Sequence, residues 1–282
     1  MSDAVELTGP RGDRVKGLLN LAIAAGEEIL KIYAEDFSAM VKGDGSPVTV
    51  ADQAAEDVIL KGLEVQFPGV PVVAEESVEA GRLPEGGDRY FLVDPLDGTK
   101  EFLKKNGEFT VNIALIEHGA PVFGVVYAPA LNEIFWGGTL PGGDKDTGAY
   151  QARVEGTEIL EAQKISVRCA PDAGLSVLAS RSHLSEETEA LISKLNVAEK
   201  LSVGSSLKLC WVAAGRADLY PRMAPTMQWD IAAGDALVRA AGGRVVYAET
   251  GQDFVYRVPQ GATKDDLRNP HFIAVSDIAL LP

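Results

Sequence analysis

Two aspartates three residues apart, Asp94 and Asp97, are the first candidates for chemistry in this chain. They follow the apolar, β-prone run 89–93, which we expect to be a buried strand. Pro95 should end its hydrogen-bond ladder and leave both carboxylates on the turn that follows. Carboxylates this close repel each other unless positive charge lies between them, and an oxygen-bound divalent cation is the simplest source of it. The alternative is an ordinary surface turn, where Asp-Pro and Asp-Gly dipeptides commonly occur.

Three further acidic residues lie near expected ends of secondary structure, where active sites tend to collect. Glu75 follows a short apolar strand, and Asp52 and Asp230 lie near the starts of helices. Each has an ordinary alternative explanation, such as Asp230 acting as the N-cap of its helix. The chain contains no GxxxxGK[ST], GxSxG or HExxH pattern, and its three histidines are scattered. Oxygen-ligated divalent-metal chemistry is therefore the interpretation that remains.

The elements that must position these residues fall into two groups. Apolar periodicity predicts helices over 14–33 and 49–66, a strand over 71–74 and, after the strand at 89–93, an antiparallel meander between residues 111 and 151. Beyond it strands alternate with helices, as in an α/β unit. We predict an N-terminal α+β metal-binding half, 1–155, and a C-terminal α/β half, 156–282, which completes the metal and substrate site.

Composition excludes several kinds of partner. The 282 residues carry a formal net charge of −15, which argues against a nucleic-acid polymer because phosphate backbones require a basic surface. No apolar run reaches membrane-spanning length, and the acidic N-terminus lacks the order of a signal peptide. Two cysteines without CxxC spacing favour a reducing compartment, so we expect a cytoplasmic protein with no integral membrane span.

Three separated motifs make the sequence recognisable: EES at 75–77, DPLDGT at 94–99 and WDIAAG at 229–234. They resemble the motifs of the inositol monophosphatase family of Mg²⁺-dependent, lithium-sensitive phosphatases, and SPVTVAD at 46–52 is similar to that family's helix-opening segment. Within the family the chain is most similar to the CysQ-type 3′(2′),5′-bisphosphate nucleotidases. The stretches that carry this resemblance are GTKEF at 98–102, NGEFTVNIA at 106–114, SRSH at 180–183, GSSLK at 204–208 and LYPR at 219–222.

The resemblance implies a layered α/β/α/β/α sandwich. It implies hydrolysis of adenosine 3′,5′-bisphosphate to AMP and phosphate, in sulfur assimilation, with two or three Mg²⁺ ions as cofactor. An inositol-1-phosphatase or related sugar phosphatase is the alternative, and either would act as a monomer or homodimer on a small phosphorylated substrate. A non-catalytic phosphate-binding module is disfavoured, because it would not need the water-activating pair named next.

The resemblance also implies roles for individual residues. Asp52 and Thr99 would be catalytic, since together they would orient and deprotonate a water molecule. The implied metal ligands are Glu75, Asp94, the Leu96 carbonyl, Asp97 and Asp230. The implied substrate-binding residues are Gly98, Thr99, Ser180, His183, Ser206, Lys208, Arg222 and Asp230, with Lys208 and Arg222 placed on a second phosphate.

Overall fold

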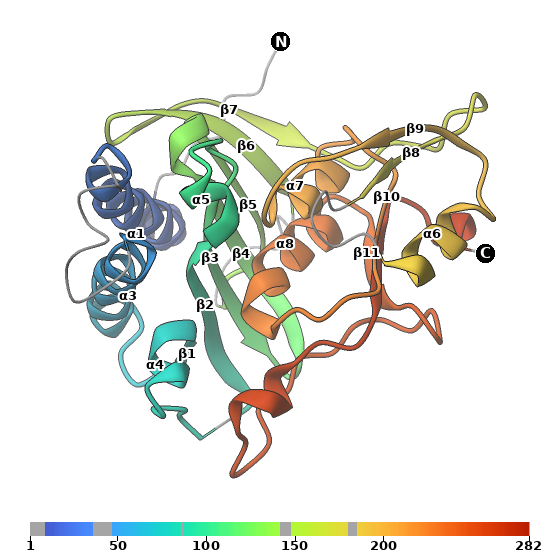
Figure 1. The fold of residues 1–282 in the computed structure, drawn as a ribbon. Coiled ribbons are helices and arrows are strands. Elements are labelled where there is room, and N and C mark those ends of the chain that lie inside the picture. Colours follow the sequence, from blue (N-terminus) through green and yellow to red (C-terminus); the bar gives the residue numbers. More distant parts are fainter. Residues whose placement is uncertain (1–8, 36–46, 86, 142–147, 180–184, 282) are drawn as a thin grey trace.

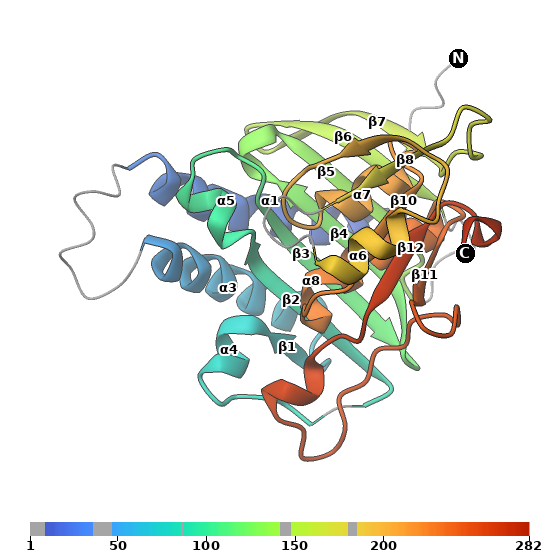
Figure 2. The ribbon, with the colours of Figure 1, turned by 45° about the vertical axis from the view of Figure 1, so that its right-hand side comes forward.

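Helices and sheets alternate in five layers across the molecule (Figure 1). The computed structural model describes residues 9–35, 47–85, 87–141, 148–179 and 185–281. The outer pair α1 (Gly9–Tyr33) and α3 (Pro47–Gln66) packs on a seven-stranded sheet, and α7 (Leu207–Ala213) and α8 (Gln228–Ala240) lie between that sheet and a five-stranded one. On the far side of the second sheet lies α6 (Glu186–Ile192), as the rotated view in Figure 2 shows. The predicted α/β/α/β/α sandwich is confirmed.

The first sheet has its strands in chain order, β1 to β7. The single parallel pair is β1 (Val72–Ala74) with β2 (Arg89–Asp97), and the later neighbours are antiparallel, which confirms the predicted meander. The later strands are β3 (Thr110–Glu117), β4 (Ala120–Ala128), β5 (Glu133–Gly138), β6 (Ala149–Glu155) and β7 (Glu158–Ile165). The apolar stripes of α1 and α3 cover one face of this sheet, and α8 covers the other.

The second sheet is mixed, with the order β11-β12-β10-β8-β9. Its strands are β8 (Leu175–Leu178), β9 (Val197–Leu201), β10 (Leu219–Arg222), β11 (Arg244–Tyr247) and β12 (Phe272–Val275). The predicted division of the chain at 155/156 falls in the turn between β6 and β7, and the first sheet continues to Ile165. The two-half division stays a prediction, while the observed change from one sheet to the other comes later in the chain.

The strand that carries Asp94 and Asp97 is longer than predicted. Both aspartates lie within β2, opposite Asn112 and Thr110 of β3, and the register shifts between them. Pro95 sits inside this irregularity, because proline has no N–H to donate to a regular ladder. The prediction that the aspartates lie on a turn after the strand is therefore wrong. They lie on its irregular final residues, so the same strand end carries both carboxylates.

The remaining short elements matter because they position the site or connect the sheets. They are α4 (Glu75–Glu79), α5 (Thr99–Leu103) and three single 3₁₀ turns at Pro129–Leu131, Lys264–Leu267 and Ile278–Leu280. Cys169 and Cys210 are free thiols. Within the described ranges, every helix is too short or too polar to cross a lipid bilayer.

Candidate active site

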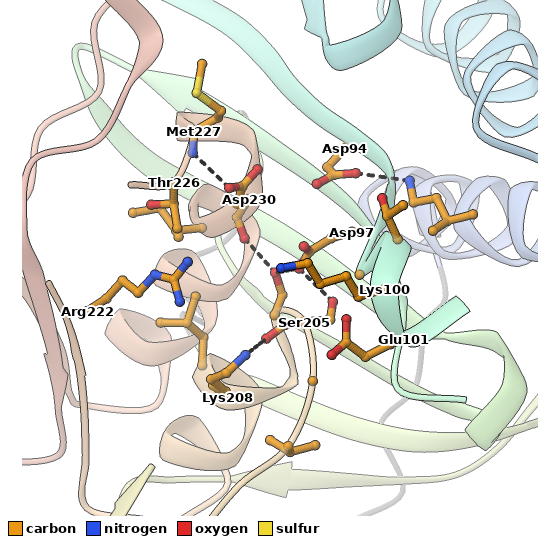
Figure 3. Close-up of a pocket in the computed structure, with 18 of the residues that line it drawn as sticks. Asp94, Asp97, Lys100, Glu101, Ser205, Lys208, Arg222, Thr226, Met227 and Asp230 are labelled. Carbon is orange, nitrogen blue, oxygen red and sulfur yellow. Dashed lines mark hydrogen bonds between the residues drawn. The ribbon is translucent and has the colours of Figure 1, made fainter. Parts of the chain in front are cut away.

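A pocket of about 300 Å³ opens where the end of β2 meets the second half of the chain (Figure 3). The first half contributes Glu75, the first residue of α4, with Asp94 and Asp97 from β2. The second half contributes Asp230, from the first turn of α8, and the segment 204–208 that leads into α7. Four of the five predicted acidic residues therefore share one pocket. Of the predicted ligand and phosphate-binding residues, Leu96, Gly98 and Thr99 also line it.

The backbone after Asp94 orients its carboxylate. Asp94 is only 2% exposed, and its Oδ1 accepts a hydrogen bond from the Leu96 N–H at 3.0 Å. Gly98 then takes φ 99°, and a Cβ there would lie 3.2 Å from the Glu108 carbonyl oxygen. Glycine is suited to this position because the left-handed conformation and the close approach both disfavour a side chain. The turn starts α5 at Thr99, directly beside the carboxylates.

Asp230 lies inside its helix and not before it. α8 begins at Gln228, before Asp230, and Met227 is its N-cap residue. The carboxylate of Asp230 accepts a hydrogen bond from the Met227 N–H at 2.8 Å. The interpretation of Asp230 as the N-cap is therefore wrong, although its side chain does satisfy one N–H at the start of the helix. The helix dipole favours a negative charge at this end.

Burial and mutual repulsion oppose ionisation of these carboxyl groups. Burial raises the pKa of Asp94 well above its ordinary value, and the charges of Glu75, Asp97 and Asp230 raise it further. Burial, followed by the charge of Asp97, does the same to the pKa of Asp230, which Arg222 partly offsets. The pKa of Glu75 rises to about 7, through burial and then through Asp97. Protonation or a nearby cation would relieve this repulsion.

The donor set suits Mg²⁺ by chemistry, because it consists of carboxylate and carbonyl oxygens without a histidine or a thiol. As the side chains stand, no three His, Cys, Asp or Glu residues of the described ranges converge as a formed metal site. Three of the carboxylates are held by hydrogen-bond donors instead: Asp94 by the Leu96 N–H, Asp97 by two serine hydroxyls and Asp230 by the Met227 N–H. The residues fit a hard cation in type and in charge. On metal binding, the carboxylates would replace these hydrogen bonds with bonds to the ion.

The serines on Asp97 include one that the sequence analysis missed. Ser205 Oγ and Ser206 Oγ donate to Asp97 Oδ2 at 2.6 and 2.9 Å. Ser205 also has the left-handed φ of 54°, which is uncommon for a residue other than glycine. Ser206 was predicted to bind substrate. The structure places its hydroxyl, on a residue 3% exposed, against Asp97 and the Asp230 carbonyl.

The predicted catalytic pair is only partly assembled. Thr99 lines the pocket, whereas Asp52, in α3, is 6% exposed and is not among the lining residues. Among the described residues, no hydrogen bond joins the two side chains. Burial raises the pKa of Asp52 to about 8, with further contributions from Glu76 and Glu75. The charge of Asp52 in turn raises the pKa of Asp94, so Asp52 is electrostatically coupled to the carboxylate cluster.

Glu56 is a positioning residue that the sequence analysis missed. It is fully buried one turn after Asp52, and its carboxylate accepts hydrogen bonds from the Glu76 N–H at 2.8 Å and the Ser77 hydroxyl at 2.6 Å. These bonds attach the start of α4, and with it Glu75, to α3. A charged residue on the inward stripe of the predicted helix was the available signal, since a glutamate is almost never buried without partners.

Cationic side chains line the same pocket as the carboxylates: Arg222 lies on the side of Asp230, and Lys100 lies beside Asp97 (Figure 3). Lys208 is 7% exposed, and its Nζ donates to the Ser205 carbonyl at 2.8 Å and lies 5.5 Å from the centre of the Tyr220 ring. Arg222 donates from Nη2 to the Pro225 carbonyl at 3.3 Å, and its buried Nε makes no hydrogen bond to the described residues. Lys100 of α5 also lines the pocket, although it was not among the predicted site residues. Ser180 and His183 lie outside the described residues.

Comparison with known proteins gives consistent matches over most of the chain. The model of the inositol monophosphatase family matches residues 13–276. The chain is 44% identical over 227 residues to the 3′(2′),5′-bisphosphate nucleotidase CysQ of Escherichia coli O157:H7, and 46% identical over 227 residues to that of Salmonella typhimurium. Both alignments cover 80% of this chain and 87% of the relative.

Solved structures agree with these matches. The crystal structure of CysQ from Bacteroides thetaiotaomicron, a bacterial member of the inositol monophosphatase family, superimposes with a TM-score of 0.77 at 38% identity, covering 95% of this chain and 98% of that one. An inositol monophosphatase from Zymomonas mobilis has a TM-score of 0.72 over 97% of this chain and 96% of its own. At 24% identity, the second comparison supports only the assignment of the fold.

Proposed function

The chain belongs to the inositol monophosphatase family, and we propose that it is a Mg²⁺-dependent 3′(2′),5′-bisphosphate nucleotidase. Its substrate would be adenosine 3′,5′-bisphosphate, which it would hydrolyse to AMP and phosphate in sulfur assimilation. The names of the CysQ relatives support this substrate class, and the family supports metal dependence. A cytoplasmic location and a monomeric or homodimeric state stay predictions.

The observation that carries the proposal is one pocket lined both by a cluster of carboxylates and by cationic side chains. We propose that two or three Mg²⁺ ions bind among these carboxylates. When bound, they would neutralise phosphate charge and lower the pKa of water. The residues that would hold them are Glu75, Asp94, the Leu96 carbonyl, Asp97 and Asp230.

The protein's own groups would then orient the substrate and move a proton. The Gly98 and Thr99 N–H groups would bind the scissile phosphate at the start of α5. The Thr99 hydroxyl would orient the attacking water, and Asp52 would accept its proton. Since the pKa of Asp52 is about 8, this acceptor is largely protonated at neutral pH until positive charge nearby lowers that pKa.

A second phosphate distinguishes the nucleotide from an inositol monophosphate. Lys208 and Arg222 would bind it, because an anion held away from the metal ions needs a cation of its own. The Arg222 Nε without a described hydrogen-bond partner supports this role, since a buried guanidinium N–H usually has an acceptor. Ser180 and His183 stay predicted contacts of the nucleotide.

Phosphate release from matched substrates tests the proposal. The panel would contain adenosine 3′,5′-bisphosphate, its 3′-phosphosulfate relative, inositol-1-phosphate and fructose-1,6-bisphosphate, each with Mg²⁺ and with EDTA. We expect Mg²⁺-dependent turnover and the highest kcat/KM on adenosine 3′,5′-bisphosphate. A preference for inositol-1-phosphate would replace the proposal with its alternative, and undiminished turnover in EDTA would refute the metal-dependent mechanism.

A further inference from the structure

A buried chain of hydrogen bonds behind the pocket orients the hydroxyl of Ser206. Thr110 Oγ1 donates to Asn112 Oδ1 at 2.9 Å, and Asn112 Nδ2 donates to Ser206 Oγ at 2.9 Å. Thr110 is fully buried, Asn112 is 1% exposed and Ser206 is 3% exposed. In the structure the Asn112 amide oxygen faces Thr110 and accepts, and the amide nitrogen faces Ser206 and donates. The Ser206 oxygen is consequently an acceptor from Asn112, and its own proton points elsewhere.

That single proton has two acceptors within reach. Asp97 Oδ2 lies 2.9 Å from Ser206 Oγ, and the Asp230 carbonyl oxygen lies 2.5 Å from it. A hydroxyl donates one full hydrogen bond, so the two acceptors compete. One comes from the first sheet and the other from the first turn of α8, and 109 residues separate Ser206 from Asp97 in the sequence. Ser206 therefore connects two of the proposed metal ligands that no local structure joins.

We propose that Ser206, oriented by Asn112, is a positioning residue for Asp97. Together with the Ser205 hydroxyl, which donates to the same oxygen, the Ser206 hydroxyl holds the Asp97 carboxylate at the pocket, so little rotamer entropy would be lost when a divalent cation binds there. With the carboxylate engaged by a cation, the Ser206 proton would still have the Asp230 carbonyl as an acceptor, so no buried donor would be left without a partner. This inference rests on the proposed metal-dependent function. It gives Ser206 a role in positioning a metal ligand instead of a role in binding the substrate.

Direct titration of the metal-free protein with Mg²⁺, by isothermal calorimetry, tests the inference independently of turnover. We expect Ser206→Ala to weaken Mg²⁺ binding by roughly 10–100-fold, the effect typical of losing a partner of a metal ligand. Ser206→Thr keeps the hydroxyl and should bind Mg²⁺ within about threefold of the parent protein. In turnover assays, Ser206→Ala should raise the Mg²⁺ activation constant and leave the KM for substrate at saturating Mg²⁺ nearly unchanged.

Ser176→Ala is the matched control. Ser176 is 4% exposed, and its hydroxyl contacts Arg168 and Glu199 at 2.6 and 2.7 Å, in the second sheet and outside the pocket lining. This control should lose stability without a change in Mg²⁺ affinity. Equal losses of affinity in Ser206→Ala and Ser176→Ala would show that Ser206 is merely structural and would overturn the inference.

Asn112→Ala tests whether Asn112 orients the Ser206 hydroxyl. It also takes the place of Ser206→Ala if the Ser206 variant does not fold. It should weaken Mg²⁺ binding, and the double variant Ser206→Ala/Asn112→Ala should be no more than about twofold weaker than Ser206→Ala, because Asn112 acts through Ser206. If the two substitutions reduce Mg²⁺ affinity independently, so that their fold-losses multiply in the double variant, Asn112 does not act through Ser206. If the parent protein itself binds no Mg²⁺, the proposed function fails. If the parent binds and Ser206→Ala binds equally well, only the inference about Ser206 fails.

Discussion

Replacing Asp52 by asparagine should stabilise the metal-free protein while abolishing most of its activity. Asp52 is 6% exposed, and burial with the surrounding glutamates raises its pKa from 3.8 to about 8. One pKa unit corresponds to about 1.36 kcal/mol, so removing this ionisable group gains at most ~6 kcal/mol once it would be charged. Solvent and side-chain relaxation reduce such buried-charge energies, and we expect a gain of about 2–3 kcal/mol in the free energy of unfolding.

The sign of the pH dependence follows from proton linkage. Between pH 4 and 8 the folded protein keeps a proton on Asp52 that the unfolded chain has lost, so this residue makes the parent protein less stable as the pH rises. The advantage of Asp52→Asn should therefore grow from about pH 4 to about pH 8 and then level off. Urea unfolding in EDTA at pH 5, 7 and 9 measures it.

A matched substitution on the same helix separates this effect from a general change in charge. Asp57 is exposed on α3, and Asp57→Asn should alter the free energy of unfolding by no more than about 0.5 kcal/mol at any of these pH values. If Asp52→Asn is no more stable than the parent at pH 9, or if its advantage shrinks with rising pH, the reasoning about a buried, repelled carboxyl group is wrong.

Four further predictions concern the pocket and its supports. Asp94→Asn should lower kcat by about 10²-fold or more and leave the fold intact, as Mg²⁺-dependent kinetics and circular dichroism would show. Thr99→Ala should reduce kcat by about 10²-fold with little change in KM, whereas a rise in KM alone would indicate a purely substrate-binding hydroxyl. Lys208→Ala and Arg222→Ala should each cost roughly 1.5–3 kcal/mol, or about ten- to a hundredfold in kcat/KM, on adenosine 3′,5′-bisphosphate and little on inositol-1-phosphate; equal losses on both substrates would contradict the second-phosphate role. Glu56→Ala should cost roughly 3 kcal/mol in urea unfolding because it leaves the half-buried Glu76 N–H and the buried Ser77 hydroxyl without their acceptor, and Glu56→Gln, which retains an acceptor oxygen, should cost clearly less.

Local patterns in the sequence predicted most of the helices and strands, whereas the layered sandwich was implied by the resemblance to the family. The helices at α1 and α3 show apolar stripes with helical spacing, and the meander shows alternating or continuously apolar strands separated by short turns. The edge strand β7 was missed because Glu158–Ile165 is mostly polar and only its last residue is buried. Pairing with β6 stabilises it as a strand, and that pairing is not visible in its own composition.

The acidic residues of the pocket were also predicted from the sequence, because carboxylates at the ends of apolar runs are a local feature. What only the tertiary structure decided is how they are held. The irregular end of β2 depends on pairing with β3, and Asp230 entered the first turn of α8 instead of capping it. Glu56 acquired its role only when α4 packed on α3. The contact of Ser206 with Asp97 joins residues 109 positions apart, on elements whose own patterns carry no sign of each other. Short-range periodicity reports which face of an element is buried, whereas the partners of a buried polar group are set by packing between elements distant in sequence.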